Sequence, residues 1–189
     1  MALIPIPLRS WNTIIPDMAR EILTDRLTAR MRLRGVYPVL FTLAANNSFL
    51  LGWCDSIADA PDGDLSLTPA AASTSGILLD TYVHELAHRL ICAVDFDFRA
   101  RPHTWTFAAM NAVLLRRVEG HIVGSRPRIQ SLKLYDVHDE AEENWGWAMQ
   151  RALDVSAELA PLPISAEECA EKIWRIWFDD RHPSMRAAR

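Results

Sequence analysis

The five residues from His84 to His88, His-Glu-Leu-Ala-His, constrain this chain more than any other stretch of it. On a helix, two histidines four positions apart lie about 40° apart around the axis and one turn apart along it, so both rings can reach one metal ion. The carboxylate of Glu85 can then accept a proton from a water molecule near that ion. This pattern is the helical signature of zinc metallopeptidases, and it predicts that His84 and His88 bind zinc.

The sequence around the motif predicts a helix. Residues 76–94 form a strongly apolar run without proline, and the two histidines lie beside an apolar stripe with helical spacing. The stripe comprises Leu79, Val83, Leu86, Leu90 and Val94. A helix with this pattern buries its apolar face and holds both imidazoles on an adjoining face.

Composition limits the classes of protein that this chain can belong to. Its 189 residues are 50% hydrophobic and 23% charged, which is ordinary for a globular protein of one domain. The net charge of −4 gives no overall attraction to nucleic acid, and no apolar run approaches the length of a membrane span. Cys54, Cys92 and Cys169 are odd in number and far apart, which favours a reducing compartment, so we expect a cytoplasmic protein.

The segments before the motif predict an α+β fold. A helix is expected over residues 16–34, followed by strands over 36–42 and 49–54 that form a hairpin across the turn Asn46-Asn47-Ser48. A third strand is expected over 65–68. The expected architecture is therefore an N-terminal helix and a small antiparallel sheet packed on the helix that carries the motif.

The segments after the motif predict further helices. These are expected over residues 104–119, 140–159 and 165–178. The last one begins with Ser165-Ala-Glu-Glu168, the pattern of a capping box.

A catalytic zinc ion usually takes a third protein ligand, and His103 is the first candidate. It follows His88 by fifteen residues, so the intervening loop can return to the metal. Glu119 is an alternative ligand, because two histidines and one carboxylate also make a zinc site. Tyr135 and His121 are candidates for a group that stabilises the transition state or orients a ligand.

Four segments together resemble the SprT-like zincin domain, over roughly residues 16–118. They are Leu51-Gly-Trp-Cys54, the alternating Leu65-Ser-Leu-Thr-Pro69, the motif His84–His88, and His103-Thr-Trp-Thr-Phe107. The family shows a helix, a short sheet, the metal-binding helix and then a third histidine. The sequence departs from the family at Thr104, where glycine is usual, and it lacks the family's common C-terminal zinc ribbon.

The resemblance implies one Zn²⁺ per chain held by His84, His88 and His103, with Glu85 as the general base of a metallopeptidase that hydrolyses protein substrates. We also expect two parts, a zincin domain over residues 1–138 and a helical C-terminal extension over 139–189 that packs on or beside it.

DNA or a DNA-bound protein is one candidate partner, because basic residues are frequent after the motif. These residues are Arg99, Arg101, Arg116, Arg117, Arg126, Arg128 and Lys133. The alternative function is a non-catalytic binding or regulatory protein on a zincin scaffold, such as an antirestriction-type accessory factor of a mobile element.

Overall fold

The computed structural model describes three short strands and three longer segments of the chain. The strands are β1 (Leu40–Phe41), β2 (Gly52–Cys54) and β3 (Leu65–Leu67), of which the backbone is described. The longer segments are residues 75–95, 101–118 and 134–181, with side chains described for 80–95, 101–117 and 136–181. The predicted helix over residues 16–34 lies outside the described residues.

Helices make up most of the described chain. The helices are α3 (Ser75–Cys92), α4 (Trp105–Val118), α5 (Trp145–Leu159) and α6 (Ala166–Arg181), with short 3-10 turns η4 (Leu134–Val137) and η5 (Glu142–Asn144). The four predicted helices in this part are confirmed, with ends that differ by a few residues.

The predicted capping box at the start of α6 is also confirmed. The Glu168 backbone N–H donates to Ser165 Oγ at 2.9 Å, and the Ser165 backbone N–H donates to Glu168 Oε2 at 2.7 Å. These reciprocal bonds satisfy two backbone groups that the helix itself leaves without partners.

The predicted α+β fold built on a small antiparallel sheet is wrong. The part of the chain with described side chains is helical, and the strands are short pieces of two or three residues. Their order is β1-β3-β2, with β1 parallel and β2 antiparallel to β3. The expected hairpin between residues 36–42 and 49–54 is not formed by β1 and β2, because β3 lies between them.

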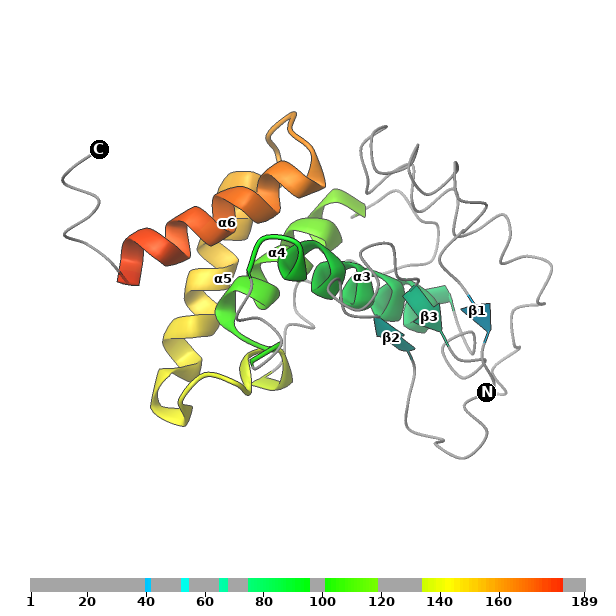
Figure 1. The fold of residues 1–189 in the computed structure, drawn as a ribbon, viewed down its shortest axis with the longest axis horizontal. Coiled ribbons are helices and arrows are strands. Elements are labelled where there is room, and N and C mark those ends of the chain that lie inside the picture. The colour runs from blue at the N-terminus through cyan, green and yellow to red at the C-terminus, as the bar shows by residue number, and fades with distance from the viewer. Residues whose placement is uncertain are drawn as a thin grey trace.

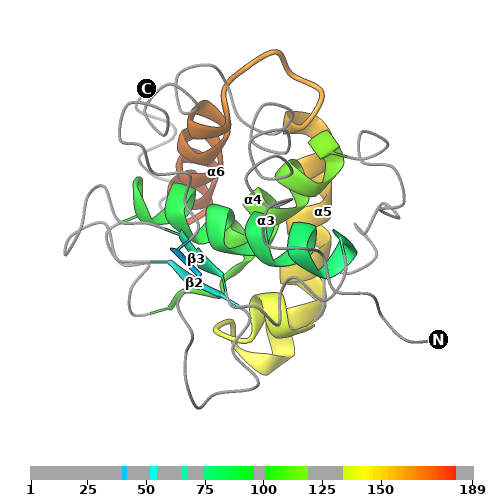
Figure 2. The same ribbon diagram turned by 90° about the vertical axis from the view of Figure 1, so that its right-hand side faces the viewer.

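Helix α4 is the centre of the helical part. Every residue from 105 to 115 is buried, because α4 packs against α3, α5 and α6. Helix α3 packs on α4 and also on β2 and β3, so it lies between the sheet and the other helices (Figures 1 and 2). The two histidines of the motif are therefore carried by a helix that is held from both sides.

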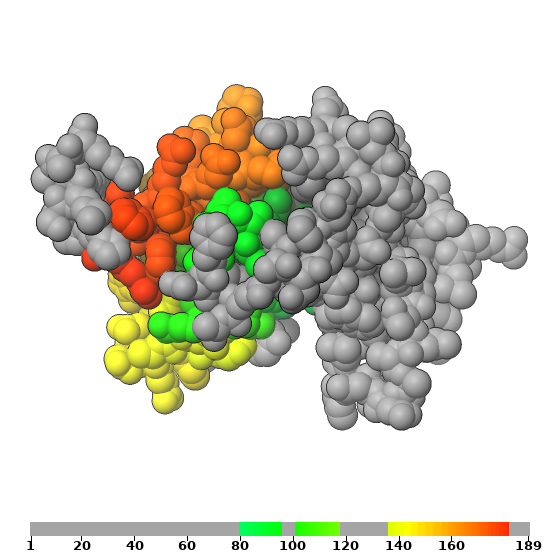
Figure 3. Space-filling view, in the orientation of Figure 1, coloured from blue at the N-terminus to red at the C-terminus, as the bar shows by residue number. Residues whose placement is uncertain are grey.

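One hydrophobic core joins α3, α4, α5 and α6. Its largest fully buried side chains include Tyr82 on α3, Phe107 and Met110 on α4, and Ile173 on α6. Helices α5 and α6 form the outer surface on the side of α4 away from the sheet (Figures 1 and 3). Among the described residues, no helix has the length and apolar character needed to cross a membrane.

Candidate metal centre

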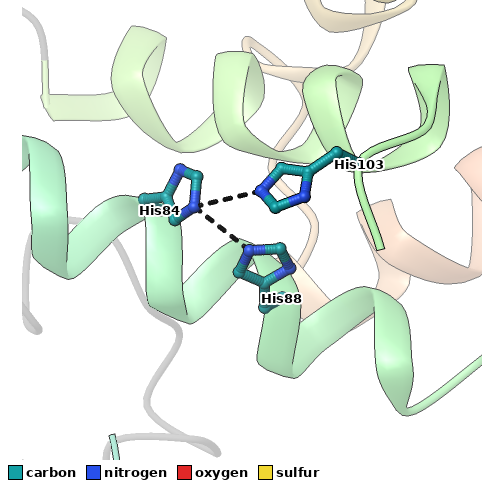
Figure 4. A group of neighbouring side chains, drawn as sticks. All are labelled: His84, His88 and His103. Carbon is teal, nitrogen blue, oxygen red and sulfur yellow. Dashed lines mark hydrogen bonds between the residues drawn. The ribbon is translucent and has the colours of Figure 1, made fainter. Parts of the chain in front are cut away.

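Three imidazole rings from two parts of the chain converge beside α3. His84 and His88 come from successive turns of that helix, and His103 comes from the segment that leads into α4 (Figure 4). His84 Nε2 lies 3.1 Å from His88 Nε2 and 3.4 Å from His103 Nε2. The predicted ligands are thus brought together, with one ring nitrogen from each histidine within a few ångströms of the others.

Burial keeps all three rings neutral at pH 7. Desolvation, together with the charge of His103, lowers the pKa of His84 to about 4. Desolvation and the charges of the other two rings lower the pKa of His88 to about 2. Desolvation and the charge of His138 lower the pKa of His103 to about 4, although Asp139 acts in the opposite direction. Three neutral imidazoles that meet at one point are a donor set that suits Zn²⁺.

Glu85 directly follows His84 on α3 and is buried, with 7% of its surface exposed. Burial raises the pKa of its carboxyl group from 4.5 to about 8. A raised pKa close to the working pH is typical of a carboxyl group that takes up and releases a proton during a reaction.

Phe107 forms an apolar wall behind the rings. It is fully buried on the first turn of α4, and its ring centroid lies 4.9 Å from that of His84, 4.2 Å from that of His88 and 5.0 Å from that of His103. The contact with His88 is stacked, with 20° between the planes. One side chain therefore limits the positions of all three imidazoles.

His103 is held by a segment that lies far from it in the sequence. Its backbone N–H donates to Asp139 Oδ2 at 2.7 Å, and the Asp139 N–H donates to the His103 carbonyl oxygen at 3.0 Å. The Trp105 N–H donates to Glu140 Oε1 at 3.0 Å, and Arg101 donates to the Asp139 carbonyl oxygen. Two carboxylates thus satisfy N–H groups at the start of α4, where negative charge is also favoured by the helix dipole.

Thr104 directly precedes the first residue of α4, at the position where the SprT-like family has glycine. Its carbonyl oxygen accepts the first helical hydrogen bond from the Ala108 N–H at 3.1 Å, and its hydroxyl group lies 2.8 Å from that of Thr106. Threonine is a favourable residue at the N-cap, the position just before the first residue of a helix. The departure from the family pattern is therefore compatible with the position of His103.

Asp136 lies behind His84. Its Oδ1 is 3.8 Å from His84 Nδ1, and the residue is only 5% exposed. This distance is longer than a hydrogen bond, so the interaction is electrostatic. A carboxylate on this side of the ring favours the tautomer with the proton on Nδ1, which leaves the lone pair of Nε2 for a metal.

The remaining predicted site residues are only partly described. Tyr135 belongs to η4, but its side chain lies outside the described set. The other residues outside it are Glu119, His121, Arg99, Arg126, Arg128 and Lys133. The roles proposed for these residues stay predictions.

Two of the predicted basic residues make contacts inside the fold. The Arg116 guanidinium donates to Ser156 Oγ at 3.0 Å. Arg117 donates to the Ala160 carbonyl oxygen at 3.3 Å, the Leu162 carbonyl oxygen at 3.4 Å and Cys169 Sγ at 3.1 Å. Both guanidinium groups thus connect α4 to the helices that follow it.

The sequence interpretation missed the segment that supports the histidines. Asp136, His138, Asp139 and Glu140 fill four of five consecutive positions, and this density of titratable side chains was the available signal. The predicted boundary between the zincin domain and the extension, at residue 138, lies within this segment. Asp139 and Glu140, which the prediction assigns to the extension, accept hydrogen bonds from His103 and Trp105 of the predicted zincin domain.

No family model, curated protein or solved structure matches this chain. The resemblance to SprT-like zincins stays a prediction, and the site is interpreted from its own geometry.

Proposed function

We propose that the chain is a zinc-dependent endopeptidase in which His84, His88 and His103 hold the metal and Glu85 is the general base. The observation that supports it most strongly is the meeting of three neutral imidazole nitrogens, two of them from a helix on which a buried carboxyl group directly follows the first histidine. Zn²⁺ in such a site supplies Lewis acidity toward water and a substrate carbonyl group, and positive charge that favours the Glu85 carboxylate.

The residues of the chain then have separate tasks. The three histidines bind through Nε2, Asp136 favours the required tautomer of His84, and Phe107 excludes water from behind the rings. The Glu85 carboxylate accepts a proton from the attacking water and delivers it to the amine that leaves when the peptide bond breaks.

The proposal extends to the compartment and the substrate class. Cys92 and Cys169 are free thiols in the structure, which supports a reducing, cytoplasmic compartment. We propose protein substrates because this combination of zinc ligands and base is typical of enzymes that hydrolyse peptide bonds.

Metal analysis combined with a cleavage assay on an unfolded protein substrate tests the proposal. We expect about one tightly bound zinc per chain, no tightly bound zinc in His88→Ala, and retained tight binding in Glu85→Gln with cleavage lowered about 10²- to 10⁴-fold. The matched control is Glu142→Gln, which changes an exposed carboxylate and should leave both properties intact.

Two results would contradict the proposal in different ways. Wild-type protein that binds no zinc under chelator-free conditions would remove the metal site. Wild-type protein that binds zinc but cleaves no better than Glu85→Gln would favour the alternative of a non-catalytic zinc protein.

A further inference from the structure

A second group of metal-ligating side chains adjoins the proposed metal centre. Within the described residues, ligand atoms of His103, His138 and Asp139 all lie within 4.8 Å of one another. His138 and Asp139 follow η4 directly, and His103 belongs to both groups. Two nitrogen donors and one carboxylate are a ligand set that Zn²⁺ accepts.

The distances in this second group suit a small metal ion. His138 Nε2 lies 3.7 Å from Asp139 Oδ1, and His103 Nδ1 lies 3.9 Å from Asp139 Oδ2. Donors around a tetrahedral zinc ion with bonds of about 2.0 to 2.1 Å are about 3.3 Å apart. The two separations from Asp139 exceed this value by about half an ångström, so coordination requires the rings and the carboxylate to move closer together.

Hydrogen bonds of the backbone hold His103 and Asp139 side by side, and the His138 ring packs on that of His103. Two hydrogen bonds join His103 and Asp139, from the His103 N–H to Oδ2 and from the Asp139 N–H to the His103 carbonyl oxygen. The ring centroids of His103 and His138 lie 4.4 Å apart, with 33° between the planes. The group is thus ordered by contacts that do not need a metal.

The second group is open to solvent on one side. The side chain of His138 is 42% exposed and that of Asp139 is 23% exposed, whereas that of His103 is 10% exposed. An ion can enter at His138 and keep water molecules in its remaining positions. Such a site with an exposed histidine and three protein ligands is expected to bind zinc more weakly than the less exposed group of three histidines.

The two groups compete for the same imidazole. A neutral histidine has one nitrogen with a lone pair and one that carries the proton. In the first group His103 offers Nε2, which lies 3.4 Å from His84 Nε2, whereas its Nδ1 faces Asp139. Binding of an ion through Nδ1 places the proton on Nε2 and removes that atom from the first group.

We propose that His103, His138 and Asp139 form a second, weaker zinc site, and that its occupation takes His103 away from the first. This inference rests on the proposed function of the first site. An ion held by His84 and His88 alone is bound more weakly and in a different geometry. Excess zinc would then inhibit the peptidase through a site built into the fold.

Calorimetric titration of the metal-free full chain with Zn²⁺ tests the second site. We expect one tight and one weaker equivalent in the wild type. His138→Ala should keep the tight equivalent and weaken the second by about tenfold or more, since it loses a ligand. Glu142→Gln, the exposed control, should retain both equivalents.

The variant His88→Ala tests the second site in the absence of the first. It breaks the first group and leaves His103, His138 and Asp139 unchanged, so it should bind one weak equivalent that disappears when His138→Ala is added. Wild type with a single tight equivalent, or a second equivalent that persists in His138→Ala, would overturn the inference and leave the proposed function intact. Wild type without a tight equivalent would contradict the proposed function itself.

Titration with Co²⁺ tests whether His103 is shared, by a measurement other than activity. The visible absorption of Co²⁺ depends on its coordination geometry. In the wild type, the absorption that develops with the first equivalent should decrease or shift as the second binds. In His138→Ala the absorption from the first equivalent should stay constant as more Co²⁺ is added. The same result in the wild type would refute competition of the two sites for His103.

Discussion

Asp136 Oδ1 lies 3.8 Å from His84 Nδ1, on the opposite side of the ring from the other two histidines. The carboxylate comes from η4, more than fifty positions after His84 in the sequence. The negative charge at this position favours the proton on Nδ1 and thereby the lone pair on the metal-facing Nε2. Asp136 is therefore a positioning residue that acts through His84.

Asp136→Asn is expected to lower zinc affinity about 10- to 100-fold without unfolding the protein. The amide keeps the size of the side chain but loses the charge that favours the proton on His84 Nδ1. Competition with a coloured chelator measures the change. Asp154→Asn, which removes an exposed carboxylate from α5, is the control, and equal zinc affinity in the two variants would refute the role of Asp136.

The metal-free protein is expected to lose stability as the pH falls below about 6.5. Desolvation lowers the pKa values of His84, His88 and His103 to about 4, 2 and 4, against an ordinary value of 6.5. Between these values the unfolded chain binds protons that the folded chain does not bind, so the free energy of unfolding decreases with decreasing pH.

Glu85 is expected to cause a second loss of stability as the pH rises from 6.5 to about 8. Its pKa is raised from 4.5 to about 8, so in this range the folded state keeps a proton that the unfolded state has released. Below pH 6.5 the effect of the three histidines on the free energy of unfolding is larger than that of Glu85. The combined contribution of the four groups to stability is therefore greatest near pH 6.5.

Thermal unfolding in the presence of a chelator, from pH 4.5 to 9, measures both effects. Glu85→Gln should remove the decrease on the alkaline side and keep the decrease on the acid side, because glutamine does not titrate. Glu142→Gln should behave as the wild type. An alkaline decrease that is the same in Glu85→Gln as in the wild type would show that another group is responsible.

The local features of the site could be predicted from the sequence, and its long-range support could not. The motif helix follows from the spacing of apolar residues and histidines, and His103 follows from the length of the loop after His88. The role of Asp139 depends on a hydrogen bond to a residue 36 positions away, which local periodicity does not encode. The prediction of the sheet was wrong for a related reason. A hairpin pairs strands that are neighbours in the sequence, whereas β1 pairs with β3, and such pairing depends on tertiary packing.

Arg117→Gln is expected to lower the free energy of unfolding by about 1 to 3 kcal/mol. The guanidinium donates to the Ala160 and Leu162 carbonyl oxygens and to Cys169 Sγ, so its loss removes bonds that join α4 to the end of α5 and to α6. Urea unfolding measures the effect. Arg175→Gln, at an exposed position of α6, should change stability by no more than about 0.5 kcal/mol.

The same pair of variants separates a structural arginine from one that binds nucleic acid. If Arg117 acts inside the fold, both variants should have the same affinity for DNA at a given salt concentration. A loss of DNA affinity in Arg117→Gln with unchanged stability would show that Arg117 belongs to a DNA-binding surface.

Phe107→Ala is expected to lower the free energy of unfolding by about 3 to 5 kcal/mol and also to weaken zinc binding. The ring is fully buried and contacts all three imidazoles, so its removal leaves a cavity directly behind the proposed ligands. Ile173→Ala provides the control, because Ile173 is equally buried in the same core but lies on α6. Both variants should unfold at lower urea concentrations, whereas zinc affinity, measured where each is fully folded, should fall only in Phe107→Ala. Equal zinc affinity in the two folded variants would show that Phe107 contributes to the core alone and that α3 and the contacts of Asp136 and Asp139 suffice to orient the rings.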